Sequence, residues 1–144
     1  MPIESDAELR DLLDSAKTIA VLGIKDSAAQ HAHRVPAYLQ AHGYRVLPVN
    51  PKLAAQPVLG VRAVASLAEL GEPPDLVNVF RAPRFVPSHT DEILAREPRP
   101  RAVWLQLGIR DDASARRLEA AGIAVVQDRC IMVEHRRLIG NRSR

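Results

Sequence analysis

The residues with the clearest chemical potential are an amide and a cation that directly follow an apolar segment. Residues 46–52 read Val-Leu-Pro-Val-Asn-Pro-Lys, so Asn50 and Lys52 come at a sharp turn after a predicted buried strand. In a parallel sheet, such a turn lies at the edge where α/β folds bind ligands. A NAD-binding fold places Asp or Glu near this position to bind the ribose hydroxyl. An amide and a cation suit a phosphorylated ribose better, which favours NADP, coenzyme A (CoA) or a related nucleotide.

Cations are concentrated in the loops that follow the predicted strands. The carboxyl ends of parallel strands share one edge, where helix amino termini also point their free amides. Lys25 and Lys52 stand out because Lys17 is the only other lysine of the chain and a compact charge suits a phosphate. An ordinary surface role is the alternative for any single arginine. We expect an anionic ligand at an edge that holds Lys25, Arg34, Lys52, Arg81, Arg84, Arg110 and Arg129 against Asp26, Asp111, Asp112 and Asp128.

The loop after the first predicted strand is not a dinucleotide-binding fingerprint. Lys25 stands where the second glycine of that motif would let a pyrophosphate approach the backbone, and Ala28 replaces the third glycine. NAD and FAD are therefore disfavoured. The sequence also lacks the lysine motif of P-loop proteins, so it gives no support to ATP hydrolysis.

Other reactive side chains form no convincing catalytic constellation. Cys130 follows the last predicted strand and begins a possible short helix, where a thiol could act as a nucleophile or form a mixed disulfide with CoA. The alternative is a small apolar side chain packed in a turn. His31 and His33 lack a further ligand for a metal, and no metal site is expected. Glu134 and His135 are adjacent on the predicted helix and should point apart.

Composition is typical of an ordinary globular protein. The 144 residues are 47% hydrophobic and 26% charged, with a formal charge of +3, and they suit one domain over residues 1–144. No apolar run approaches the roughly 18 residues of a membrane span, and the acidic amino terminus does not resemble a signal peptide. We therefore expect a cytoplasmic protein. A single cysteine excludes an internal disulfide, and scattered aromatic residues argue against nucleic-acid binding.

Strand and helix patterns alternate along the whole chain. A capping box at Ser5 and Glu8 predicts a short helix that ends near Lys17, and a second one starts at Ser66. Pro36 is expected in a first turn, which places the start of that helix at His33 or Arg34. The pattern predicts an α/β fold, a Rossmann-like, doubly wound, five-stranded parallel sheet with helices on both faces. Its strands are expected at residues 18–23, 45–49, 76–80, 102–107 and 123–126, with further helices at 86–96 and 111–121.

The chain resembles the stand-alone CoA-binding proteins related to the amino-terminal domain of the succinyl-CoA synthetase α subunit. The likeness covers about residues 12–140 and rests on residues 19–23, 43–46, 48–52, 79–81, 103–109 and 128–135. It implies that the backbone around Gly23, Ile24, Lys25, Asp26 and Ser27 cradles the CoA phosphates. It also implies that Asn50, Pro51 and Lys52 hold the nucleotide end, and that Phe80, Arg81, Arg84, Gln106 and Gly108 flank the pantetheine.

This sequence departs from the synthetase pattern after its first strand, where Lys25 and Asp26 replace a Thr-Gly turn. It also ends before the domain that carries the phosphorylated histidine of the synthetase. We therefore expect a non-catalytic binding or regulatory module for CoA or an acyl-CoA. An NADP-dependent oxidoreductase and a docking subunit for a synthetase-like partner are the alternatives.

Overall fold

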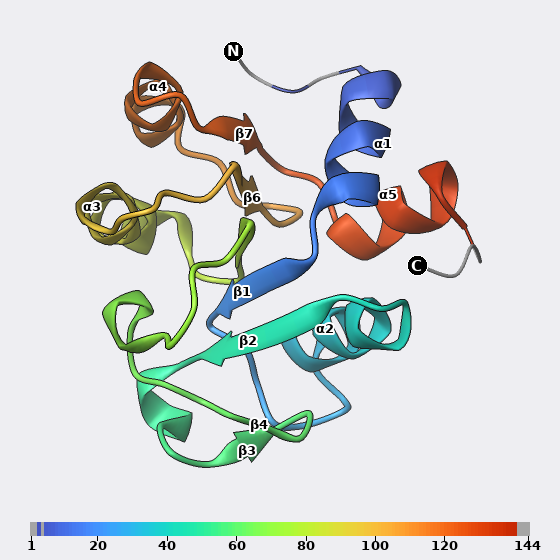
Figure 1. Cartoon of the computed structure of the whole chain (residues 1–144), viewed down its shortest axis with the longest axis vertical. Coiled ribbons are helices and arrows are strands. Elements are labelled where there is room, and N and C mark those ends of the chain that lie inside the picture. The colour runs from blue at the N-terminus through green and yellow to red at the C-terminus, as the bar shows by residue number, and fades with distance from the viewer. Residues whose placement is uncertain (1–2, 4, 141–144) are drawn as a thin grey trace.

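A five-stranded parallel sheet forms the centre of the molecule. The computed structural model describes residue 3 and residues 5–140. The strand order is β2-β1-β5-β6-β7, which confirms the predicted doubly wound α/β sheet (Figure 1). Every predicted strand is present and ends within two residues of its expected bounds. The strands are β1 (Thr18–Leu22), β2 (Arg45–Val49), β5 (Leu76–Val79), β6 (Ala102–Leu105) and β7 (Ala124–Val126).

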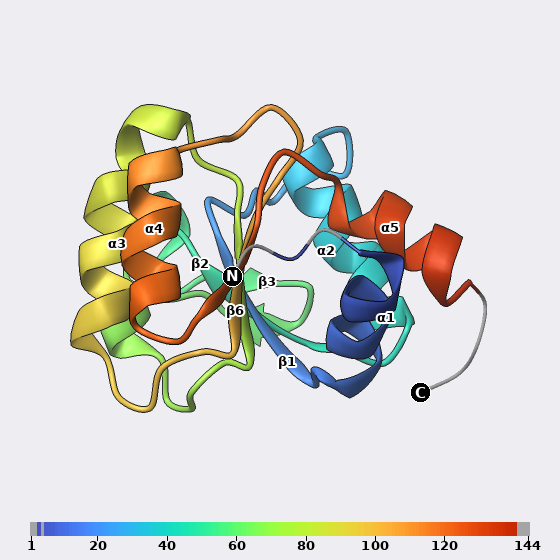
Figure 2. The ribbon, with the colours of Figure 1, turned by 90° about the horizontal axis from the view of Figure 1, so that it is seen from above.

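Helices cover both faces of this sheet. Figure 2 shows α3 and α4 on one face and α1, α2 and α5 on the other. Neighbouring residues of β1 alternate between the two layers: Ile19 and Val21 pack in the core beneath α1, α2 and α5, whereas Ala20 and Leu22 pack beneath α3 and α4. Such strands are apolar at most positions because both faces are buried. The helices are α1 (Asp6–Ser15), α2 (His31–Ala41), α3 (Val86–Ala95), α4 (Asp112–Ala120) and α5 (Ile131–Leu138).

Short elements fill the long connection between β2 and β5. The capping box that starts at Ser66 is present and includes Glu69, but it begins a single 3₁₀ turn, η2 (Leu67–Glu69). An antiparallel hairpin precedes it and was not expected from the sequence, since each strand has only two residues. The remaining elements are η1 (Pro51–Leu53), β3 (Pro57–Val58), β4 (Val61–Arg62) and η3 (Pro83–Phe85).

The start of α2 differs from the prediction, which placed Pro36 in a first turn. The helix begins at His31, so Pro36 lies in the second turn and supplies no N–H to the carbonyl of Ala32. The backbone N–H of Lys25 donates to that carbonyl instead, at 3.2 Å. Pro36 therefore leaves a helix carbonyl free to hold the loop that carries Lys25.

The strand order reverses at β1, which lies between β2 and β5. In open α/β sheets this reversal creates a crevice at the carboxyl ends of the strands. The loops after β1, β2 and β5 border that crevice.

None of the helices in the described part of the chain has the length and apolar character needed to cross a bilayer. The expectation of one domain over residues 1–144 stays a prediction, and residues 1, 2, 4 and 141–144 of that range lie outside the described residues.

Candidate functional site

A cationic cavity lies at the carboxyl ends of β1, β2 and β5. Its volume is about 460 Å³, which is within the range of small-molecule sites. The loop after β1 contributes one wall, the turn at η1 a second, and the segment through η3 a third. Its lining residues are Gly23, Lys25, Asn50, Lys52, Phe80, Arg81, Ala82, Arg84 and Phe85.

Four positive side chains line this cavity: Lys25, Lys52, Arg81 and Arg84. Among residues 3 and 5–140, no salt bridge involves any of them. Two other cations of the same sheet edge have acidic partners, Arg110 with Asp112 at 3.0 Å and Arg129 with Glu134 at 3.7 Å, whereas Arg34 donates to the carbonyl of Ala29. Four cations without an acidic partner among the described residues thus share one cavity, which suits an anion.

Phe85 holds the two arginines of the cavity in place. The guanidinium carbon of Arg81 lies 4.3 Å from the centroid of the Phe85 ring, and that of Arg84 lies at 4.6 Å. Both distances are in the range of cation–π attraction. The ring orders two flexible side chains and leaves their N–H groups available to a ligand.

Backbone contacts fix the three loops relative to one another. Gly23 has a φ of +82°, and a Cβ there would lie 2.6 Å from the carbonyl oxygen of Phe80, so only glycine fits. Asn50 is buried; its Nδ2 donates to the carbonyl of Ile24 at 2.7 Å, and its Oδ1 accepts from the N–H of Lys52 at 2.9 Å. The side chain of Asn50 thus joins the loops after β1 and β2, and this contact orients Lys52.

An apolar cavity of about 440 Å³ adjoins the cationic one and shares Phe80 with it. Leu107 and Val133 lie on its wall and are the large apolar side chains most exposed in the described chain, at 69% and 50%. Exposed apolar groups around a hollow indicate a surface that a ligand or a partner covers. The lining residues are His31, Ala32, Phe80, Gln106, Leu107, Ile109, Cys130, Met132 and Val133.

Gln106 is the buried polar group of the apolar cavity, with 5% of the residue exposed. Its Oε1 accepts from the Nδ2 of Asn78 at 3.2 Å and from the backbone N–H of Ile131 at 2.9 Å. These two bonds fix the orientation of the amide. They also tie the end of β6 to the start of α5.

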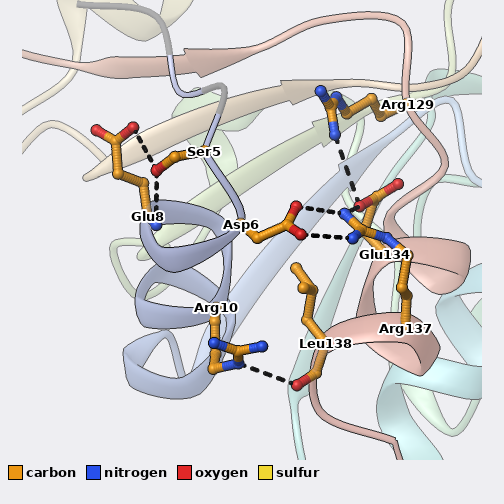
Figure 3. A network of polar contacts seen from close by, with 8 residues as sticks. All are labelled: Ser5, Asp6, Glu8, Arg10, Arg129, Glu134, Arg137 and Leu138. Atoms are coloured by element: carbon orange, nitrogen blue, oxygen red, sulfur yellow. Dashed lines mark hydrogen bonds and ion pairs between the residues drawn. The ribbon is translucent and has the colours of Figure 1, made fainter.

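A polar network holds α5 against α1 (Figure 3). Arg137 donates to both carboxylate oxygens of Asp6 at 2.8 Å and to Glu134 at 2.5 Å, and Glu134 also pairs with Arg129. The hydrogen bonds from Arg137 hold the pKa of Asp6 below its usual value. Arg10 reaches the carbonyl of Leu138 at 3.2 Å. Because Cys130 is the N-cap residue of α5, this network also positions that wall of the apolar cavity.

Most of the predicted site residues lie together, and some do not. The side chain of Ile24 is fully buried, Asp26 and Ser27 are exposed, and Arg34 donates to the carbonyl of Ala29 at 2.7 Å. The N–H of Gly108 donates to Asp128 at 2.6 Å. Residues that line one of the two cavities are Gly23, Lys25, Asn50, Lys52, Phe80, Arg81, Arg84, Gln106 and Cys130. Those that line neither are Ile24, Asp26, Ser27, Arg34, Pro51 and Gly108.

Several residues that line the cavities were not predicted from the sequence. Phe85 carries no motif, although Phe80 and Phe85 are the two phenylalanines of the chain and both lie on the cationic cavity. That scarcity was the available signal. The sequence contains no signal for the apolar wall formed by Leu107, Met132 and Val133, because this wall depends on how α5 packs.

Comparison with known proteins identifies the group to which the chain belongs. Residues 17–136 match a family described as a CoA binding domain. The chain belongs to the CoA-binding domain family. This result agrees with the resemblance seen in the sequence, and it covers all three loops of the cationic cavity.

Relatives of this CoA-binding domain protein include the uncharacterized protein YneT of Bacillus subtilis (strain 168), which is 37% identical over 131 residues, 91% of this chain and 94% of YneT. A solved structure of a Thermus thermophilus protein designated cell-free ID.343 is 51% identical with a TM-score of 0.90, covering 94% of this chain and all of that one. A hypothetical protein from Pyrococcus horikoshii OT3 is 30% identical with a TM-score of 0.89, covering 97% of each chain. The fold is therefore that of stand-alone CoA-binding domain proteins.

Proposed function

We propose that this protein binds CoA or an acyl-CoA as a binding or regulatory module. The observation that carries the proposal is the pair of adjoining cavities, which meet at Phe80: one is apolar, and the other is lined by four cations that have no salt bridge within the described part of the chain. CoA has the same division, since its nucleotide end bears a 3′-phosphate and a pyrophosphate and its pantetheine arm is largely uncharged. Membership of the CoA-binding domain family and the likeness to the synthetase α subunit support the same ligand.

The cationic cavity would hold the phosphate groups. Lys25 and Lys52 supply compact charges, and Arg81 and Arg84 supply planar N–H forks that suit phosphate oxygens. The cavity lies at the reversal of strand order, where α/β sheets bind ligands. The arm would then pass Phe80 and cover the exposed side chains of Leu107 and Val133.

The apolar cavity favours CoA over NADP and ATP. NADP would place a polar nicotinamide ribose where Leu107, Ile109 and Met132 lie, and ATP has no group to fill that space. Burying polar groups against such a wall without hydrogen bonds is unfavourable. The amino-acid pattern after β1, with Lys25 in place of a glycine, argues in the same direction.

Isothermal titration calorimetry in the presence of a reductant tests the proposal. The panel is CoA, acetyl-CoA, 3′-dephospho-CoA, NADP and ATP. We expect the tightest binding for CoA or acetyl-CoA and weaker binding without the 3′-phosphate, because one charge contact is lost. Binding of NADP but not of CoA would overturn the proposal in favour of an oxidoreductase. Binding of none of the five would favour a docking role with a synthetase-like partner.

A further inference from the structure

Cys130 is the N-cap residue of α5 and lies on the wall of the apolar cavity, partly exposed. It is the one cysteine of the chain, so no second thiol of the same molecule competes for it. In the bipartite site proposed above, this wall is where the far end of the pantetheine arm, and hence its thiol, would lie. The position of Cys130 therefore brings two thiols into one cavity.

An independent feature of the same cavity indicates a bound group. Both acceptor contacts of Gln106 are made by Oε1, and among the described contacts its Nε2 donates to nothing. Gln106 Nε2 is not one of the fully buried polar atoms without a partner. Because it has no partner among the described contacts, it must be at least partly accessible. The residue is 95% buried and lines the cavity, so the cavity is the open space within reach of these N–H groups.

A buried amide with an unused donor in an apolar cavity calls for an acceptor. The pantetheine arm carries two amide carbonyls that can serve. A hydrogen bond from Gln106 to one of them would fix the arm along the wall that ends at Cys130.

We propose that Cys130 is a site of covalent capture, at which the protein forms a mixed disulfide with CoA by exchange with a CoA disulfide. The inference rests on the proposed CoA site and adds a redox function to it. The protein would then distinguish oxidised from reduced CoA by retaining the former covalently.

The exchange needs no oxidant beyond the disulfide itself. The Cys130 thiol loses its proton to solvent, and the thiolate attacks one sulfur of CoA–S–S–CoA. The Sγ–S bond forms as the original S–S bond breaks, and its electron pair leaves with the second CoA as a thiolate, which takes up a proton. One disulfide is consumed and one is formed. A thiol reductant cleaves the mixed disulfide: it releases CoA and the free Cys130 thiol, and the reductant is itself oxidised to a disulfide.

Intact-protein mass spectrometry under non-reducing conditions tests the proposal. Incubation with CoA disulfide should add the mass of one CoA less two hydrogens, and a thiol reductant should remove it. Cystamine, a small disulfide without phosphates, is the comparison reagent. We expect modification by CoA disulfide to be faster by about tenfold or more, because the phosphate contacts hold the reacting sulfur beside Cys130.

Two variants define where this preference arises. Lys52→Glu should bring the rate with CoA disulfide close to that with cystamine, whereas Lys17→Ala, at the opposite edge of the sheet, should retain the full preference. Cys130→Ser should give no adduct. If that variant fails to fold, the parent protein suffices, because its adduct has one possible thiol.

The outcomes separate this inference from the proposed function. If the reduced protein binds CoA in calorimetry but CoA disulfide gives no adduct, or reacts no faster than cystamine, covalent capture is overturned and the CoA site stands. If the reduced protein does not bind CoA, the proposed function fails first. A selective, reductant-sensitive adduct in the parent, lost in Lys52→Glu, would support both.

Discussion

The four cations of the cationic cavity differ in how the protein holds them. Arg81 and Arg84 rest on the ring of Phe85, whereas Lys52 is exposed and is oriented through the backbone by Asn50. An exposed lysine interacts with a phosphate over a solvated distance, so its contribution depends on ionic strength.

Lys52→Ala should weaken CoA binding by about fivefold at low salt, the size of one exposed charge contact, and by less at high salt. Calorimetry at two salt concentrations measures both effects. Lys17→Ala removes the same charge from the far edge of the sheet and should leave the affinity unchanged. Equal affinities of Lys52→Ala and the parent at low salt would remove Lys52 from the site.

Phe85→Leu should lower CoA affinity by roughly tenfold, since two cation–π contacts of about 0.5–1 kcal/mol each no longer order Arg81 and Arg84. Phe85→Tyr keeps an aromatic face and should bind almost as tightly as the parent. Calorimetry on all three proteins, with thermal unfolding to confirm that each is folded, gives the comparison. A similar loss of CoA affinity in Phe85→Leu and Phe85→Tyr would show that the aromatic face does not determine the affinity.

Gly23 and Gly60 have nearly the same backbone conformation, with φ of +82° and +77°, but different surroundings. A Cβ at Gly60 meets nothing within 4 Å, whereas one at Gly23 meets the Phe80 carbonyl oxygen at 2.6 Å. Gly60→Ala should cost about 1 kcal/mol of unfolding free energy through its φ alone. Gly23→Ala should cost at least about 1–3 kcal/mol more, because the loops must separate.

Chemical denaturation of both glycine variants measures this difference. Equal costs would mean that the loops after β1 and β5 adjust freely, and the close approach would not be a fixed part of the site.

The position of some site residues could be predicted from the sequence, and that of others could not. The position of Lys25 and Lys52 at one edge of the sheet could be predicted, because they are rare residues placed after strands whose carboxyl ends must share an edge. Phe85 and the free amide of Gln106 could not, since their roles depend on side-chain directions. Arg34 looked equivalent to the other cations, but its guanidinium is held by the carbonyl of Ala29, outside both cavities.

Among the elements, α5 is joined to α1 by a polar network (Figure 3). The pKa of Asp6 is lowered by the hydrogen bonds from Arg137. Its folded value therefore lies below the unfolded one. The stabilisation is fully present above the ordinary aspartate range and is lost as the pH falls through the folded pKa.

Asp6→Asn should therefore unfold at a lower temperature than the parent at neutral pH, and the difference should shrink as the pH falls below the ordinary aspartate range and Asp6 is protonated. Because Asp6 is exposed, the effect is expected to be small. Thermal unfolding by circular dichroism at several pH values follows it. Asp11→Asn, on the same helix but outside the network, is the control. A difference that grew toward acid would contradict the assigned sign.

Elements with a long apolar pattern could be predicted, and those set by tertiary contacts could not. The five strands are mostly apolar runs, interrupted only by single residues such as Asn78 in β5, so their type and position followed from the sequence. The two-residue strands of the β3–β4 hairpin are too short for any periodicity. The predicted start of α2 was wrong. Pro36 can lie in the second turn because the carbonyl that it leaves free accepts a hydrogen bond from Lys25.

At the scale of the whole molecule, a ligand that fills both cavities would join the loops after β1, β2, β5 and β6 to α5. Binding to the folded state alone adds to its stability. CoA at about 100 times its dissociation constant should contribute about 2.7 kcal/mol and raise Tm by roughly 5–15 °C. Differential scanning fluorimetry with and without CoA checks this under reducing conditions. An unchanged Tm at saturating CoA would contradict the proposed site.

Phe80 lies between the two cavities, so a ligand fragment that fills one cavity does not reach the other. Adenosine 3′,5′-bisphosphate or pantetheine alone fills one compartment and gives up its own freedom of motion for only half of the contacts. The intact cofactor loses that freedom once, so its affinity should exceed the product expected from the separate pieces. A screen of fragments would therefore underestimate the affinity of this site, and binding assays should use the intact ligand.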